Sequence, residues 1–130
     1  MSYKTLIVLL VAVSIFVTAC GSKVKETQTV SAPPTAAEVL KEDNNADLLM
    51  VHDTLYQTNI DWVNQLDVIK DKEIGKVESK YSVGSGQTFK NKMANNIPVG
   101  TKIYSTKERN DVLIVEINGI EKKYYALTEG

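Results

Sequence analysis

The chain contains a single cysteine, Cys20, and a single histidine, His52, among its 130 residues. One cysteine cannot form a disulfide within the chain, nor can it supply a thiolate metal site. One histidine excludes a zinc helix of the His-Glu-x-x-His kind, and a Ser-His-Asp triad would have to use His52 itself. A folded domain in this chain must therefore depend on its apolar core.

The chain also lacks an excess of charge, because 15 Lys and Arg residues oppose 16 Asp and Glu residues. That balance provides no basic surface for binding nucleic acid or anionic lipid by charge alone. The acidic residues do not follow the spacing of a calcium loop, whether in the set Asp43, Asp47 and Asp53 or in the set Asp67, Asp71 and Glu73. We expect no nucleic-acid partner, no metal site, no cofactor and no catalytic residues.

The most apolar run, Leu6 to Val17, is too short to cross a membrane as a helix. A spanning helix needs about 20 apolar residues, whereas this run has the length of the apolar region of a secretory signal, and Lys4 gives it a positive start. The run ends at Val17-Thr18-Ala19-Cys20, where a small residue precedes the cysteine. This ending resembles the lipobox of bacterial lipoproteins, which implies that Cys20 is lipidated.

We therefore predict a cleaved signal peptide over residues 1–19 and a lipid anchor on Cys20. A diacylglycerol supplies the two acyl chains that stable anchoring requires. Without Lys4 the mature chain keeps 14 basic and 16 acidic residues, a formal net charge of -2. The expected location is the extracytoplasmic face of the cell membrane.

Residues 20–45 are predicted to be the lipidated cysteine and a flexible tether. Gly21-Ser22 begins a polar stretch, and Ser31-Ala32-Pro33-Pro34 interrupts any helix. Thr35 to Glu38 has the spacing of a capping box, which favours either a short helix to about Lys41 or a nascent turn within a disordered spacer. A compact domain is expected to fill residues 46–130.

Two elements are expected early in this domain. The strand-like runs Asp47 to His52 and Leu55 to Thr58 are joined around Asp53-Thr54, which predicts a hairpin. After them, Asp61 is placed to cap a helical turn that carries Trp62, Val63 and Leu66 on one face. Trp62 is expected to contribute to the core.

The strongest local pattern is a C-terminal hairpin. Val112 to Ile117 and Ile120 to Leu127 flank Asn118-Gly119, a pair favoured in type I′ turns because both positions need φ > 0. Closure there places Ile117 opposite Ile120, and Leu113 and Val112 opposite Tyr124 and Tyr125. Because Val112 to Ile117 is apolar on both faces, we expect it to be a central strand, with the Trp62 helix as a candidate to cover it.

The region between these hairpins predicts two more strands. One contains Ile74 and Val77 and continues to Lys80, and the other, Thr101 to Ser105, follows a turn at Ile97 to Gly100. The expected fold class is α+β, predominantly β: a small antiparallel sheet or partial barrel with one or two short helices.

The order of these motifs resembles that of a known kind of protein. A hairpin with a tyrosine is followed by Trp62-Val63, Glu73 to Val77, Pro98 to Tyr104 and Tyr124 to Leu127. Over residues 47–130 this order resembles small exported lipoproteins of Gram-positive, Bacillus-type bacteria, most specifically in Pro-Val-Gly-Thr-x-Ile-Tyr. The resemblance implies a location in the cell envelope and a compact β-rich domain, and it assigns no catalytic residue.

The segment from Tyr81 to Asn96 is longer than most connections in a compact domain. Gly84 to Thr88 lacks the lysine and the upstream glycine of a phosphate-binding loop, so it reads as a linker. The segment is either a solvated polar loop or part of a rim that faces a ligand. The residues of such a rim would be Phe89, Lys90, Lys92, Met93 and Arg109.

Two classes of function fit the sequence. The favoured one is a membrane-tethered, non-enzymatic domain that binds or modulates an envelope protein or a secreted peptide. The alternative is a small cell-envelope enzyme, or an enzyme accessory, that acts on wall or peptide substrates. A deep pocket beside His52 would favour the enzyme, whereas a shallow apolar groove or an exposed strand edge would favour the binding domain.

Overall fold

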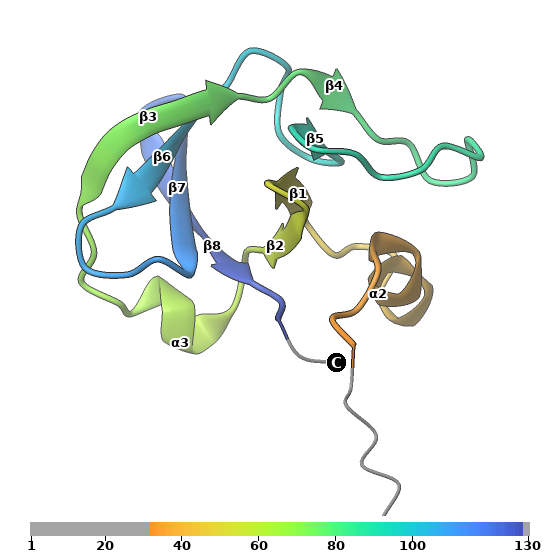
Figure 1. The fold of residues 1–130 in the computed structure, drawn as a ribbon, viewed down its shortest axis with the longest axis horizontal. Helices are drawn as coiled ribbons and strands as arrows, with labels where there is room; N and C mark the ends of the chain where they lie inside the picture. Colours follow the sequence, from red (N-terminus) through yellow and green to blue (C-terminus); the bar gives the residue numbers. More distant parts are fainter. Residues whose placement is uncertain (1–31, 129–130) are drawn as a thin grey trace, which may run out of the picture. The chain divides into compact units, whose positions relative to one another are not determined.

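A computed structural model describes residues 32–128, which form a curled β-sheet with two short helices (Figure 1). The predicted α+β class with mostly β structure is confirmed. The predicted signal peptide, Cys20 and residues 21–31 of the predicted tether lie outside the described residues.

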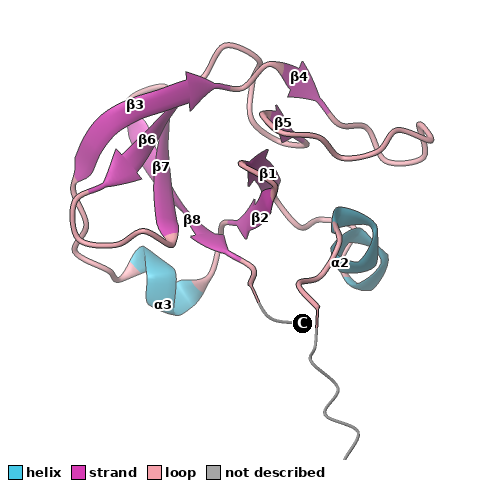
Figure 2. Ribbon diagram, in the orientation of Figure 1, coloured by secondary structure: helices cyan, strands magenta, loops and turns pink. Residues whose placement is uncertain are grey.

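One sheet contains all the strands of residues 32–128 (Figure 2). All neighbouring strands are antiparallel except β4 and β5, which are parallel. Only Val77 and Glu78 separate the two edge strands, β3 and β4, so the sheet curls back towards its own beginning as a partial barrel. The strand order is β3 (Lys70–Lys76), β6 (Lys102–Thr106), β7 (Val112–Ile117), β8 (Ile120–Ala126), β2 (Thr54–Gln57), β1 (Leu48–Val51), β5 (Met93–Ala94) and β4 (Ser79–Lys80).

The C-terminal hairpin has the predicted register. Ile117 pairs with Ile120 and Leu113 with Tyr124, while Asn118 and Gly119 have φ angles of 52° and 78°. Strand β7 lies between β6 and β8, and its first four residues are buried. The prediction of a central strand is therefore confirmed.

The first hairpin, β1 and β2, turns one residue earlier than expected. The turn residues are His52 and Asp53, with φ angles of 49° and 61°. Aspartate is among the non-glycine residues that adopt positive φ most readily. Asp53 is thereby fixed at the tip of the hairpin.

The helix α3 (Asp61–Asn64) corrects two predictions. Its N-cap is Ile60 rather than Asp61, and no side chain caps it. Val63 is completely buried, but Trp62 is 48% exposed and lies against Tyr125 of β8 instead of covering β7. Neighbouring residues of a helix are about 100° apart around its axis, so a single turn directs only one of the two inwards.

The helix α2 (Ala36–Glu42) moves the predicted domain boundary. It begins at the predicted capping box, and its residues Ala36 and Leu40 are buried. All the described residues before β1 belong to the same compact unit as the strands, so residues 32–45 are part of the folded domain and not of a tether. Their buried contacts lie on strands that come later in the chain, which is why local composition did not reveal them.

Alternate side chains of β1 and β2 divide the core in two. Leu49, Val51 and Tyr56 point into the curl of the sheet and form an inner core with residues of β6, β7 and β8. Leu48 and Leu55 lie on the opposite face and form an outer core with α2, Phe89 and Met93. Both faces of this hairpin are therefore buried.

Candidate binding cleft

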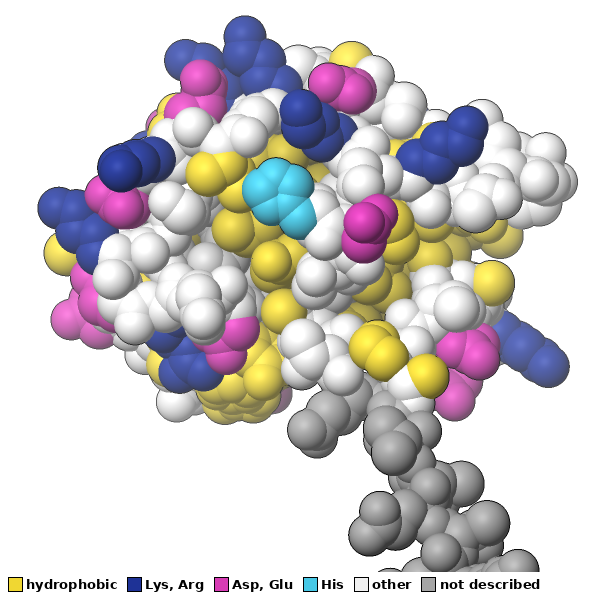
Figure 3. All heavy atoms as spheres, viewed as in Figure 1, with side chains coloured by type: hydrophobic (Ala, Val, Ile, Leu, Met, Phe, Trp, Pro, Cys, Tyr) yellow, Lys and Arg dark blue, Asp and Glu magenta, His cyan; other side chains and the backbone are white. Residues whose placement is uncertain are grey.

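A cleft of about 570 Å³ lies beside the outer core. Its lining is mostly apolar, and its volume falls in the usual range of ligand sites, about 300 to 1,000 Å³. Figure 3 shows hydrophobic side chains gathered across the middle of one face of the domain. We call this feature the apolar cleft, and its lining residues are 33–37, 50, 53–55, 81, 87–89, 127 and 128.

The first wall of the apolar cleft is the start of α2. The Thr35 backbone N–H donates to Oε2 of Glu38 at 2.8 Å, and the Glu38 N–H donates to the Thr35 hydroxyl at 3.2 Å. The Thr35 hydrogen bonds to the Glu38 carboxylate lower the pKa of Glu38. This reciprocal capping holds Pro34, Thr35 and Ala36 in place at the edge of the cleft.

The second wall comes from the long loop. The rings of Tyr81 and Phe89 lie 5.0 Å apart, and Phe89 and Met93 are both buried in the outer core. Gln87 and Thr88 continue this wall towards solvent. Residues 82–88 of the loop are exposed, as expected of a solvated loop, but Phe89 and Met93 anchor it in the outer core.

Asn91 links this loop to the hairpin at the base of the cleft. The Asp53 N–H donates to Oδ1 of Asn91 at 2.6 Å, and Nδ2 of Asn91 donates to Oδ1 of Asp53 at 2.8 Å. The Lys92 N–H also donates to the Met50 carbonyl at 2.7 Å. These three bonds hold the hairpin tip at the base of the cleft against the loop that forms its second wall.

The basic residues of the predicted rim do not gather here. Lys92 pairs with Glu78 at 3.5 Å, while Arg109 pairs with Asp111 at 2.7 Å and lies 5.7 Å from the centre of the Trp62 ring. None of the three basic residues lines the apolar cleft, and Met93 is in the core beneath it. Of the predicted rim, only Phe89 contributes to the site.

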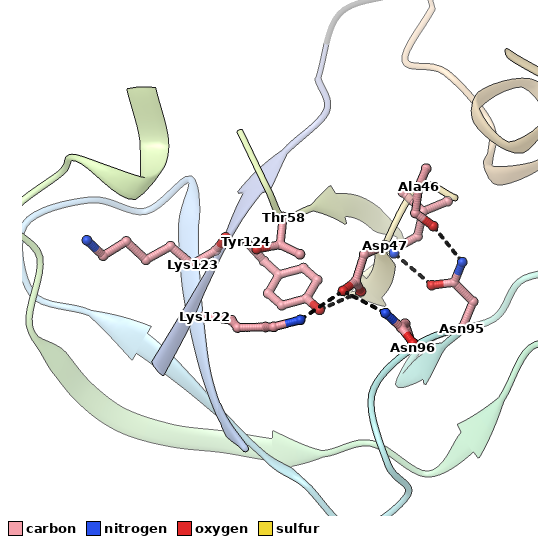
Figure 4. Close-up of polar contacts among 9 residues, drawn as sticks. Ala46, Asp47, Thr58, Asn95, Asn96, Lys122, Lys123 and Tyr124 are labelled. Atoms are coloured by element: carbon pink, nitrogen blue, oxygen red, sulfur yellow. Dashed lines mark hydrogen bonds and ion pairs between the residues drawn. The ribbon is translucent and has the colours of Figure 1, made fainter. Parts of the chain in front are cut away.

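A buried polar network lies apart from the cleft, inside the curl of the sheet (Figure 4). Asp47 is 2% exposed and accepts a hydrogen bond from the Tyr124 hydroxyl at 2.6 Å, and its other oxygen lies 3.3 Å from both Lys122 Nζ and Asn96 Nδ2. Burial, and then the Asp47 hydrogen bond, raise the pKa of Tyr124, so its hydroxyl stays protonated as a donor. All partners of this carboxylate are donors, as a buried charge requires.

Asn95 adds to the same polar interior, because its side-chain amide binds backbone groups at the start of β1, as a neighbouring strand would. Its Oδ1 accepts from the Leu48 N–H at 2.8 Å, and its Nδ2 donates to the Ala46 carbonyl at 2.7 Å. The network thereby joins the start of β1 to the segment after β5 and to β8. Its geometry is that of a structural cluster with its hydrogen bonds satisfied.

The hollow beside His52 is open, with a volume of about 420 Å³. The Thr106 hydroxyl in its wall donates to the backbone carbonyl of Arg109 at 2.6 Å, so it is engaged with the backbone instead of with the imidazole. Tyr56, also in the wall, is largely buried, and that burial raises its pKa. The structure thus places His52 on an exposed turn above an apolar floor.

Comparisons with other proteins add no further assignment. No family model, curated protein or solved structure matches this chain. Between residues 32 and 128, no helix has the length and apolar character needed to cross a bilayer. The same residues include no group of three or more His, Cys, Asp or Glu side chains that could hold a metal ion.

Sequence reasoning missed the apolar cleft and the Asp47 network. The cleft joins four separate segments between residues 33 and 128, and the network joins Asp47 to Tyr124, so no local spacing could reveal them. One signal was present: Phe89 and Met93 are large apolar residues inside a segment that is mostly polar or glycine. Apolar residues four positions apart in such a segment indicate a buried anchor as readily as a ligand-facing rim.

Proposed function

We propose that this protein is a lipoprotein anchored through Cys20 to the extracytoplasmic face of the membrane, and that its folded domain binds an envelope protein or a secreted peptide. The apolar cleft is the observation that carries the second part. Two of the units that bound it, the hairpin tip and the long loop, are joined by hydrogen bonds, the third is fixed by its own capping box, and the apolar walls are available at the surface. A preformed apolar site of this size suits an apolar group of a partner.

Anchoring is tested by labelling cells with a fatty acid such as palmitate. The wild-type chain should incorporate the label and enter the detergent phase, whereas Cys20→Ala should do neither. Labelling of the Cys20→Ala variant at the wild-type level would refute lipidation at this residue.

Binding through the cleft is tested separately by capture from membranes. Ala37 is exposed and lines the cleft, so Ala37→Trp should fill it, while Lys41→Trp adds the same bulk to an exposed position of α2 outside the lining. A partner retained by the wild type and by Lys41→Trp should be lost with Ala37→Trp. Equal capture by all three proteins would contradict the assignment of the cleft as the binding site.

A further inference from the structure

The apolar cleft opens beside a second hollow of about 500 Å³, and Pro34 and Leu127 line both. Every charged side chain in these two linings is acidic: Asp53 in the cleft, and Glu38 and Glu42 in the hollow. The three residues are exposed, and within residues 32–128 none of their carboxylates forms an ion pair with Lys or Arg. Negative charge without a basic partner therefore borders an apolar surface.

Two of these carboxylates are held in position. Asp53 lies at a hairpin tip with fixed backbone geometry and is bound by the Asn91 amide, and the capping box orients Glu38. Hydrogen bonds from neutral donors leave the charge of a carboxylate in place. The border thus offers oriented negative charge on two sides of Pro34.

We infer that the apolar cleft binds a short cationic peptide, with an apolar side chain of the peptide in the cleft and its basic side chains beside Asp53 and Glu38. This inference rests on the proposed binding function and specifies the chemistry of the partner. Complementary charge speeds encounter and discriminates against like-charged partners. The formal net charge of -2 on the mature chain acts in the same direction.

Two other occupants fit the site less well. An acyl chain would cover the apolar walls but leave the acidic border without a partner, and the carboxylate of a free fatty acid would meet Asp53 and Glu38 as a like charge. A second copy of this domain would bring the same acidic border to the interface. Only a ligand that is both apolar and cationic satisfies both parts of the surface.

The inference is tested by titrating labelled peptides into the mature chain, residues 20–130 with Cys20→Ser, and measuring fluorescence anisotropy. The main probe is an amidated peptide of alternating leucine and lysine. Matched probes replace every lysine by glutamate or every leucine by serine, and a fluorescent fatty acid represents the acyl occupant. The leucine–lysine peptide should bind. Its affinity should fall as salt rises from 0.05 to 0.5 M, because the added ions screen the attraction between its lysines and the exposed carboxylates.

Variants separate the apolar part of the site from the charged part. Ala37→Trp should abolish binding of the leucine–lysine peptide, and Lys41→Trp should not change it. Asp53→Asn keeps a side chain that tolerates positive φ and should weaken binding about two- to fivefold, the range of an exposed ion pair. Asp71→Asn removes the same charge from exposed β3, outside both linings, and should leave the affinity unchanged.

Several outcomes would overturn the inference. Equal affinity for the leucine–glutamate peptide would eliminate the role of the acidic border, and binding of the fatty acid in preference to the peptides would assign the cleft to an acyl chain. The first result would leave the proposed binding function standing, whereas the second would also remove the cleft from that function. Binding of the leucine–lysine peptide that survives Ala37→Trp would place it elsewhere on the surface and also remove the cleft from the proposed function.

Discussion

The inner and outer cores share the β1–β2 hairpin but are enclosed in different ways. Hydrogen-bonded strands surround the inner core, and its members Leu49, Ile103 and Tyr124 have no exposed surface. A seven-residue helix and a long loop cover the outer core, where Leu40 and Phe89 each remain 8% exposed. The enclosed inner core is suited to stabilising the fold, whereas the less completely covered outer core leaves room for a cleft.

This difference also separates the polar groups. The inner core contains the Asp47 network, whose carboxylate is almost completely buried and has three donors. The outer core borders exposed carboxylates that have no basic partner within residues 32–128. Charge that is neutralised by protein donors stabilises the fold, and charge that is left at the surface is available to a ligand.

The largest expected loss of stability comes from shortening a buried leucine, and two neighbouring leucines compare the two cores. Leu48 and Leu49 are both completely buried but face the outer and inner core respectively. Leu49→Ala should lower the free energy of unfolding by about 4 kcal/mol and Leu48→Ala by about 2 kcal/mol, because a loosely covered site collapses around a cavity more easily. Urea unfolding of both variants measures the difference, and equal losses would show that the outer core is as tightly packed as the inner one.

The second-largest loss of stability is expected from a change in the Asp47 network. Tyr124→Phe removes the donor to Asp47 while keeping the ring, and should cost about 2 kcal/mol because a charged buried group loses a hydrogen bond. Tyr125→Phe provides the matched control at the neighbouring, half-exposed position and should change stability little. The comparison requires thermal and urea unfolding of both; similar stabilities would show that Lys122 and Asn96 satisfy Asp47 without the phenol.

The β7–β8 turn tests a feature outside both cores. Gly119 has a φ of 78° and no neighbouring atom within 4 Å of the place a Cβ would occupy, so Gly119→Val should be destabilising by roughly 1 to 3 kcal/mol through backbone strain alone. Asn118→Gly should cost much less. A melting temperature of Gly119→Val within a degree or two of the wild type would contradict the strain argument.

The smallest effect belongs to the outer layer. Thr35→Ala removes the N-cap of α2 and should lower stability by about 1 kcal/mol. Hydrogen exchange should show the loss in α2 and the 81–96 loop, while amides of β7 and β8 keep their protection. Uniform loss of protection across the sheet would mean that the outer layer and the sheet unfold as one unit.

Local chemistry was enough to predict several elements. Asn118-Gly119 between two apolar runs determines the β7–β8 register, since a two-residue turn leaves one way to pair the flanking strands. Thr35 and Glu38 similarly mark where α2 begins, the helix being one of the two structures that their spacing favoured. Both depend only on residues within a few positions of one another, and the predicted partial barrel follows from the number and spacing of such runs.

Local sequence patterns did not predict how these elements pack against one another. The sequence predicted a tether where α2 packs, put Trp62 in the core, and gave Phe89 and Met93 either a solvated loop or a rim in place of the core. Each of these errors concerns which face of an element finds a partner, a property set by strands that are distant along the chain. The candidate cleft was invisible for the same reason.

The sequence by itself determined the β7–β8 hairpin with its turn and the place where α2 begins, because φ preferences, capping and alternation act between neighbouring residues. Only the tertiary structure decided that the sheet curls to enclose Tyr124 and Asp47, and that α2 and the 81–96 loop meet over the outer face of β1. Which apolar surfaces become buried depends on how all the elements pack together, so burial is a property of the whole fold. The apolar cleft lies where α2 and the 81–96 loop leave part of the outer core uncovered.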